Sequence, residues 1–547
     1  MITMSVVIAA GAAIARRNGF DFHKRIFTRL NITVALIAVQ VFIYFVLIQR
    51  FIDFLPFATV ISYVTSFAII LWLVIKDESA GPKISWILVI ITLPTVGVIL
   101  YLLFGSNYPS RRLRARLTRE REATAKLLQC EDTGLLDVRS GGEGVGLSDF
   151  KMRNSEVTHS DRRVAGCLSY INEVASYPAY ANTKTKYYPH GSLMFMDMLT
   201  ELASAEKFIF MEYFIIEEGQ MWDQILEVLL QKAEEGVDIR LIFDDLVSQL
   251  LFTSKFETNL REKGIKTVRF NPISPLFRPV MNNRDHRKLL LIDGHVGFTG
   301  AVNIVDDSIY PSEKFGIWKD TGLRLNGDAV WSFTLMFIEI WNSFCKPNER
   351  ISDHFAYKAT GKYINDGIVI PYGDSPFISE RIGENIYIDI LNMAQDYVYI
   401  FSPFLIISEK MIYALQMAAK RGVDVRIVLP GKYDWKRAIV QRVSRAYYRY
   451  LHKVGIKIYE TPTGYLHAKS FVCDDKIAVV GTVNLDYRSL YLHFECATLL
   501  YKTGTIQDLK EDALQTIATA NEIKPDAKRR AGRYLLDAVI HLFAPVM

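Results

Sequence analysis

The sequence predicts an α/β protein in which two mixed-sheet α/β repeats form one pseudo-two-fold unit, preceded by an N-terminal transmembrane helical region. Three observations support this prediction. Apolar residues are concentrated in the first 105 positions, the remainder of the chain contains one strand–helix–strand pattern twice, and each copy carries the same polar motif. The 547 residues are enough for two domains and an additional segment.

Three apolar runs follow one another in the N-terminal region, at 32–48, 57–75 and 84–104. A helix needs about 20 apolar residues to span a bilayer, and the second and third runs reach that length while the first is marginal. Basic residues flank the set on both sides and favour the cytoplasm at both ends. We therefore expect residues 1–105 to form a multi-pass anchor of two to three segments in the cell membrane. Two full spans are favoured, with the run containing Pro94 and Gly97 re-entrant or tilted and the other domains cytoplasmic.

A cluster of basic residues follows the third run directly, with six arginines between positions 111 and 121. Such a cluster either attracts anionic lipid headgroups or marks a solvated helix face. The five cysteines are widely scattered and form no CxxC pair, so neither a disulfide framework nor a zinc site is indicated. This cysteine usage favours a reducing compartment.

The repeat divides the rest of the chain. A basic linker and lead-in (106–180) precedes a first domain (181–350) and a second domain (351–510), and an amphipathic tail (511–547) ends the chain. In each domain two apolar, strand-like runs flank a helical pattern, at 207–215 and 236–245 in the first copy and at 397–406 and 422–430 in the second. The tail either lies on the membrane surface or packs on the soluble part.

The repeated motif is HxKxxxxD. The run DHRKLLLIDGHVGFTGAVN places His286, Lys288 and Asp293 in this pattern, and the run LHAKSFVCDDKIAVVGTVN places His467, Lys469 and Asp474 in it. An asparagine follows each histidine by 17 positions, at Asn303 and Asn484. One such motif arises easily by chance, but two with the same spacing and the same following strand do not.

These residue types suit phosphodiester chemistry. A histidine and a lysine two positions apart in an extended chain point to the same face and can converge on one phosphate. One imidazole can attack phosphorus while the other transfers protons, and the lysines and asparagines can hold the phosphoryl oxygens. No metal or other cofactor is needed for this scheme. Asp293 and Asp474 fall on the opposite parity, so they are expected to brace a turn rather than contact substrate.

A nucleophilic histidine needs a group that fixes its tautomer, usually a carboxylate on its second ring nitrogen. Candidates lie downstream of the motif in each copy, Asp320 in IWKDTG and Glu495 in LHFECA. The alternative is that they are ordinary carboxylates at a surface or a sheet edge.

The paired HxKxxxxD motifs, each followed by GxxN, resemble those of the phospholipase D superfamily. Within it, the run GTVNLDYRSLYLHFE resembles the cardiolipin synthase signature, and PTVGVILYLLFG resembles that family's membrane anchor. The resemblance implies transfer of a phosphatidyl group between two phosphatidylglycerol molecules through a phosphohistidine, giving cardiolipin and glycerol. It also implies His286 as nucleophile and His467 as acid and base, whereas the residues alone fit either order. One departure is His493, where many relatives have asparagine; this ring either tunes acceptor choice or is structural.

Other functions fit the same motifs. Water or another alcohol as acceptor would make the protein a phospholipase D or a different phosphatidyltransferase, and a non-catalytic lipid-binding scaffold is a third reading. A nucleic-acid partner is not expected, because the chain lacks a long basic groove interleaved with aromatic residues. The expected partners are phosphatidylglycerol and anionic membrane lipids. A monomer is chemically sufficient, and a homo-oligomer is also compatible with the sequence.

Overall fold

The structure is a computed structural model that describes scattered positions between 38 and 49 and most of the chain from 56 onwards. The described ranges are 56–76, 80–105, 111–129, 159–245, 255–272, 283–311, 316, 318–352, 363, 367–378, 380–431 and 438–524. The run 32–48 therefore lies mostly outside the described residues. Residues 130–158 of the predicted linker and the last 23 residues of the tail lie outside them entirely.

The first half of the body is built on a seven-stranded mixed sheet in the order β1-β9-β7-β6-β2-β3-β4. The parallel strands β2, β3 and β4 form one side, and antiparallel strands form the other. The predicted strands at 207–215 and 236–245 are β2 and β3. The strand bounds are β1 Thr183–Tyr188, β2 Phe208–Tyr213, β3 Asp238–Asp244, β4 Lys266–Phe270, β6 Lys288–Ile292, β7 Val296–Gly300 and β9 Gly322–Gly327.

The second half repeats this order strand for strand. Its main path is β10-β19-β17-β16-β11-β13-β14-β20, so only the edge strand β20 lacks a counterpart in the first sheet. The predicted strands at 397–406 and 422–430 correspond to β11, with the short β12 after it, and to β13. The bounds are β10 Ile368–Asp374, β11 Tyr397–Phe401, β12 Leu405–Ile406, β13 Asp424–Pro430, β14 Lys457–Thr461, β16 Ser470–Cys473, β17 Ile477–Gly481, β19 His493–Tyr501 and β20 Asn521–Glu522. Two α/β repeats with mixed sheets are thus confirmed.

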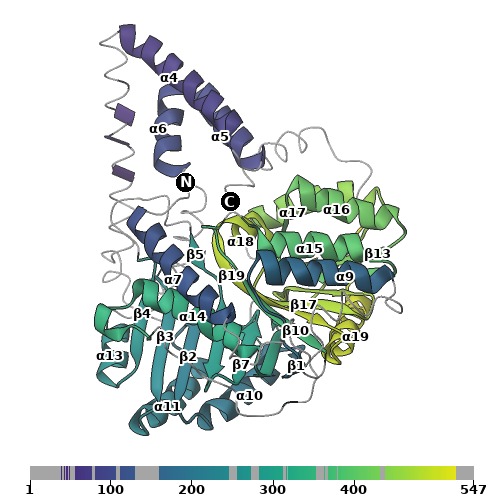
Figure 1. Cartoon of the computed structure of the whole chain (residues 1–547). Helices are drawn as coiled ribbons and strands as arrows, with labels where there is room; N and C mark the ends of the chain where they lie inside the picture. Colours follow the sequence, from purple (N-terminus) through teal and green to yellow (C-terminus); the bar gives the residue numbers. More distant parts are fainter. Residues whose placement is uncertain are drawn as a thin grey trace.

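Helices cover both sheets (Figure 1). Their positions follow from apolar faces: α11 buries Met221, Trp222, Ile225 and Leu229 on one side, at helical spacing. In contrast, α14 is buried along nearly its whole length, because it contacts strands of its own sheet and also β10 of the second sheet. The bounds are α9 His159–Ser169, α10 Gly191–Ala203, α11 Gln220–Glu234, α13 Phe256–Glu262, α14 Val330–Phe344, α15 Ile382–Met393, α16 Glu409–Lys420, α17 Ala438–His452, α18 Tyr487–Tyr491 and α19 Thr505–Thr519.

The two halves exchange short strands. The short strand β5 (Arg284–Asp285) of the first half pairs in parallel with β19 of the second half. Reciprocally, the short strand β15 (Tyr465–Leu466) of the second half pairs in parallel with β8 (Trp318–Lys319) of the first half. Each exchanged strand ends immediately before a motif histidine. The sheet pairing therefore carries each HxK segment to the opposite half of the molecule.

The N-terminal helices α4 (Pro56–Ile75), α5 (Ala80–Thr92) and α6 (Pro94–Phe104) project from the body (Figure 1). The third apolar run is two helices, because proline at the first position of α6 starts a new helix after Leu93. A Cβ atom on Gly97 would lie 2.6 Å from the Val89 carbonyl oxygen, so the close return of α6 onto α5 requires glycine. In the part of the chain that the structure describes, no helix combines the length and apolar character needed to cross a membrane. The predicted transmembrane segments are thus not confirmed.

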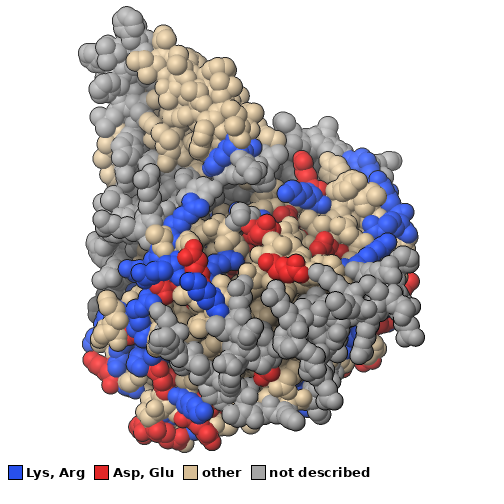
Figure 2. All heavy atoms as spheres, viewed as in Figure 1, with Lys and Arg blue, Asp and Glu red and all other residues tan. Residues whose placement is uncertain are grey.

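The arginine cluster lies on α7 (Arg111–Gln129), which packs against α14 and buries Leu117 and Leu128. Glu120 is almost fully buried there and is bound by the Arg350 guanidinium through bonds of 2.9 and 3.0 Å. Burial raises the pKa of Glu120, but Arg350 and Arg119 outweigh it and lower the pKa overall. Lys and Arg side chains gather on this part of the surface, below the mostly uncharged projecting helices (Figure 2). One face of α7 therefore packs against the first half of the protein, and basic side chains occupy the opposite face of the same helix.

Candidate active site

His286 lies in the two-residue gap between β5 and β6. The spacing of the motif had predicted that His286 lies within a strand. Its backbone N–H donates to the Phe494 carbonyl oxygen at 2.9 Å, and its ring Nδ1 lies 2.9 Å from Glu495 Oε2. Both partners belong to β19 of the second half. Glu495 is completely buried, so the first histidine is held by the other repeat in both its backbone and its ring.

His467 is held in the reciprocal way, in the gap between β15 and β16. Its backbone N–H donates to the Lys319 carbonyl oxygen at 3.0 Å, and its ring Nδ1 lies 2.6 Å from Asp320 Oδ1. The two carboxylates suggested by the sequence therefore do contact the histidines, but each contacts the histidine of the opposite copy. Sequence distance had associated Asp320 with His286 and Glu495 with His467. The exchanged strands reverse that pairing.

Burial controls the charge of both imidazoles. It lowers the pKa of His286 to about 3, against the opposing effect of Glu495. It also lowers the pKa of His467 to about 4, with Lys469 adding to the effect and Asp320 opposing it. Burial raises the pKa of Glu495, but the adjacent His286 outweighs it and holds the pKa below its ordinary value. Near neutral pH each ring is uncharged and offers one nitrogen for chemistry while a carboxylate holds the other.

The two motif lysines lie beside the histidines and are buried. Lys288 Nζ donates to the His286 carbonyl oxygen at 2.7 Å, and Lys469 makes the same bond to the His467 carbonyl. Burial lowers the pKa of Lys288 to about 8, and burial together with the charge of Lys288 lowers the pKa of Lys469 well below its usual value. Two buried lysines whose charged forms are disfavoured by burial form a site that an anion can stabilise.

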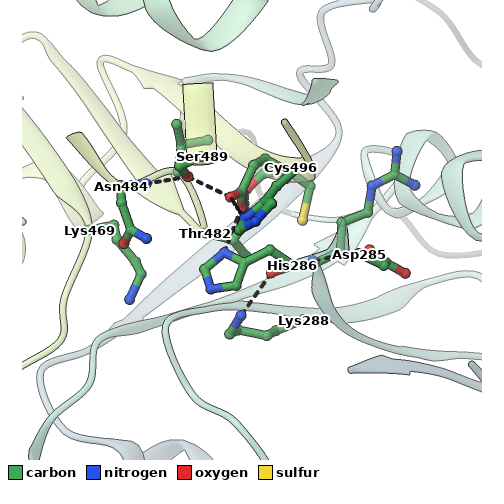
Figure 3. Close-up of polar contacts among 12 residues, drawn as sticks. Asp285, His286, Lys288, Lys469, Thr482, Asn484, Ser489 and Cys496 are labelled. Atoms are coloured by element: carbon green, nitrogen blue, oxygen red, sulfur yellow. Dashed lines mark hydrogen bonds and ion pairs between the residues drawn. The ribbon is translucent and has the colours of Figure 1, made fainter. Parts of the chain in front are cut away.

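The asparagines complete this anion site. Asn303 and Asn484 follow the ends of β7 and β17 and are buried, and neither Oδ1 atom has a hydrogen-bond partner among the described residues. Figure 3 shows Asn484 next to Lys469, and across from them His286 and Lys288. The structure thus brings the predicted histidines and lysines, together with Asn484, to the junction of the repeats.

The two motif aspartates lie elsewhere. Asp293 has φ = 49° in the turn after β6, and its carboxylate accepts the backbone N–H groups of residues 206, 207 and 208 at 2.7–2.8 Å. Asp474 repeats this arrangement with φ = 50° and the N–H groups of residues 395, 396 and 397 at 2.8–3.0 Å. Both tie the turn to the start of a neighbouring central strand, as the parity argument expected.

Comparison with known proteins identifies the family of this chain. The family model described as "Cardiolipin synthase, PLD-like domain" matches residues 198–322 and 387–516, and the model "Phospholipase_D-nuclease N-terminal" matches residues 64–106. Cardiolipin synthase 1 of Bacillus anthracis is 30% identical over 92% of this chain and 96% of its own. The chain belongs to the cardiolipin synthase family of the phospholipase D superfamily.

The chain is also similar to other proteins. Cardiolipin synthase 2 of Staphylococcus epidermidis is 32% identical over 90% of this chain and 97% of its own. An uncharacterised protein of Streptococcus mutans is 39% identical over 87% of this chain and 99% of its own. The crystal structure of phosphatidylserine synthase from Haemophilus influenzae covers 71% of this chain with a TM-score of 0.54, and at 13% identity it shows a shared fold.

Sequence reasoning missed two hydroxyl groups of this cardiolipin synthase family site. Thr482 Oγ1 donates to Glu495 Oε2 and Ser489 Oγ donates to Oε1, each at 2.5 Å. The position of Ser489, five residues after Asn484, is repeated by Ser308 after Asn303, and that repetition could have marked it. Thr482 has no such signal, because Ala301 occupies the matching position. The carboxylate that holds His286 therefore carries two hydroxyl bonds, whereas Asp320 Oδ2 has no hydrogen-bond partner among the described residues.

Proposed function

We propose that the protein transfers a phosphatidyl group from one phosphatidylglycerol to the terminal hydroxyl of another, producing cardiolipin and glycerol. The observation that supports this most strongly is the pair of buried imidazoles, each bound at Nδ1 by a carboxylate of the opposite repeat, beside two buried lysines. A phosphodiester anion supplies the negative charge that these lysines lack. The named relatives are cardiolipin synthases.

The chemistry proceeds in two displacements. His286 Nε2 attacks phosphorus, the bond from phosphorus to the glycerol oxygen breaks, and His467 gives its proton to that oxygen. The hydroxyl of the second phosphatidylglycerol then attacks phosphorus and gives its proton to His467, and the bond to His286 breaks. His467 must begin this cycle protonated. A bound phosphate anion offsets the charge of Lys469, one of the causes that lower the pKa of His467 in the free site.

The unequal carboxylates support this division of roles. Glu495 accepts two hydroxyl hydrogen bonds besides its contact with His286, which stabilises its charge and keeps it an acceptor for Nδ1–H. That arrangement suits a nucleophile whose tautomer must stay fixed. Asp320 lacks comparable bonds in the described structure, so more of its charge acts on His467. That arrangement suits a group that takes up and releases a proton.

The activity is tested with purified protein and vesicles of phosphatidylglycerol alone. Cardiolipin with an equal amount of glycerol is the expected outcome. Phosphatidic acid as the sole product identifies water as the acceptor and a phospholipase D, and no turnover favours the non-catalytic scaffold. His286→Ala and His467→Ala should each abolish turnover, and full activity in either variant contradicts the two-histidine scheme.

The two roles are separated with a phosphodiester bearing a nitrophenyl group, whose departure requires no acid. His467→Ala should still release one equivalent of nitrophenol in a rapid burst, because His286 can attack without proton donation. His286→Ala should release none. A burst in His286→Ala with none in His467→Ala would reverse the assignment.

We also propose that the N-terminal region attaches this enzyme to the cytoplasmic face of a bacterial cell membrane, where both substrates reside. Large apolar side chains are exposed along α4, including Val60, Val64, Phe67 and Leu71, and most of the surface of the projecting helices in Figure 2 is uncharged. Exposed apolar area of this kind is typical of contact with lipid or protein. Flotation with vesicles should be weakened by Val64→Glu combined with Phe67→Glu. Labelling of a cysteine placed at 110 from outside the cell would contradict the cytoplasmic placement.

A further inference from the structure

A third imidazole lies next to His286. The ring of His493, at the start of β19, is 5.6 Å from the His286 ring, measured between centroids. The corresponding position in the other half is Trp318, two residues before Asp320 as His493 is two before Glu495, and its ring is 5.5 Å from that of His467. Each of these two rings thus lies beside one of the catalytic histidines. Only His493 brings ring nitrogens that can bind a ligand.

The two ring nitrogens of His493 make no hydrogen bonds in the described structure. The His493 side chain is 10% exposed, and neither Nδ1 nor Nε2 has a hydrogen-bond partner among the described residues. The Glu495 carboxylate lies close to this ring, with 3.7 Å between His493 Nδ1 and Glu495 Oε1. The Phe214 ring lies 5.1 Å from the His286 ring and 6.5 Å from the His493 ring, which places both imidazoles against one apolar side chain. A buried polar group without partners is costly unless something binds to it.

Ligand atoms of His286, His493 and Glu495 all lie within 4.8 Å of one another. Two imidazoles and one carboxylate are a ligand set that Zn²⁺ accepts, with a fourth position left for water or an anion. Imidazole nitrogens favour Zn²⁺ and Cu²⁺ over Mg²⁺ and Ca²⁺. We propose that His286, His493 and Glu495 form a binding site for a transition-metal ion of the Zn²⁺ class, and that occupation of this site inhibits the enzyme.

Inhibition follows from which histidine is coordinated. A metal ion on His286 Nε2 occupies the lone pair that attacks phosphorus. A metal ion on Nδ1 instead requires the tautomer in which the single ring proton has moved from Nδ1 to Nε2, and Nε2 then no longer carries the lone pair that attacks phosphorus. Ligand atoms around tetrahedral zinc are about 3.4 Å apart, so the most widely separated pair must close by up to about 1.4 Å. The metal ion is therefore an inhibitor of the histidine chemistry and takes no part in it.

Metal binding is tested on the full chain in detergent by calorimetric titration with ZnCl₂. The comparison includes His493→Phe, which keeps a ring but no nitrogen, and His493→Trp, which copies the residue at the matching position of the other half. Each variant should bind zinc at the site at least about tenfold more weakly. Trp318→His should add a second site built with His467 and Asp320. This measurement does not depend on the proposed function.

The inhibition itself rests on the proposed function. Cardiolipin formation by the unchanged protein should fall as ZnCl₂ is added, should recover when EDTA is added, and should not respond to MgCl₂. The zinc concentration for half inhibition should rise at least about tenfold in His493→Phe, with each protein referred to its own metal-free rate. Equal zinc affinity and equal inhibition in both folded His493 variants would overturn the inference. Absence of turnover in every protein would refute the proposed function and leave the titration to decide the metal site.

Discussion

Replacing Asp293 should unfold the protein more readily while leaving its chemistry intact. Asp293→Ala removes the acceptor of three backbone N–H groups, and Asp293→Asn keeps Oδ1, which accepts from residues 207 and 208, but loses Oδ2, which accepts from residue 206. A hydrogen bond to a charged group contributes about 1.5–3 kcal/mol. The asparagine variant should therefore lose about 2 kcal/mol, and the alanine variant, which loses all three bonds, about three times that. For a domain of this size 2 kcal/mol corresponds to a fall in Tm of about 4–8 °C.

The assay combines a thermal unfolding scan with cardiolipin formation measured well below each variant's Tm. Asp474→Asn is the matched comparison, since Asp474 makes the same three bonds at the same turn of the second repeat but is less buried, so its loss should be smaller. The reasoning is refuted if Asp293→Asn keeps its Tm but loses kcat by about 100-fold or more, the size expected for removal of a group that transfers protons.

Three further outcomes follow from the site and from α7. The value of kcat/KM should decline as pH rises through about 8. Burial lowers the pKa of Lys288 to about 8, so above that pH the free enzyme loses a positive charge that attracts phosphate. A flat pH–rate profile between 7 and 10 would contradict this. Glu495→Gln should lower kcat by about 10⁴-fold, as loss of an orienting carboxylate does elsewhere, and Thr482→Val by about tenfold, in cardiolipin assays on folded protein. Arg350→Met should leave Glu120 buried without its main partner, and faster hydrogen exchange in α7 would register the loss.

The sequence predicted the repeat and its chemistry because both depend on local patterns. Apolar runs and glycine-containing turns determine the strands, and the spacing of His286 and His467 from Asn303 and Asn484 reflects one strand pair and its turn. The break at Pro94 was also foreseeable, since proline cannot continue a helix without losing a backbone bond.

The pairing of histidine and carboxylate could not be predicted in the same way. It depends on two-residue strands, β5 and β8, that are too short for a periodic signal and join residues 209 and 147 positions apart. The hydroxyl of Thr482 was missed for a related reason, because a threonine after a strand is usually structural and its contact with Glu495 is apparent only in three dimensions.

The reciprocal strands have a consequence for how such an enzyme can be divided or simplified. A single repeat contains a nucleophile without its carboxylate and a carboxylate without its nucleophile, so cutting the chain between the halves yields two fragments that are inactive alone and complementary together. A protein with only one repeat would have to dimerise around a two-fold axis to complete its sites. In the joined chain the two repeats can diverge in sequence, and a substitution at the carboxylate of one half alters the environment of the histidine in the other half.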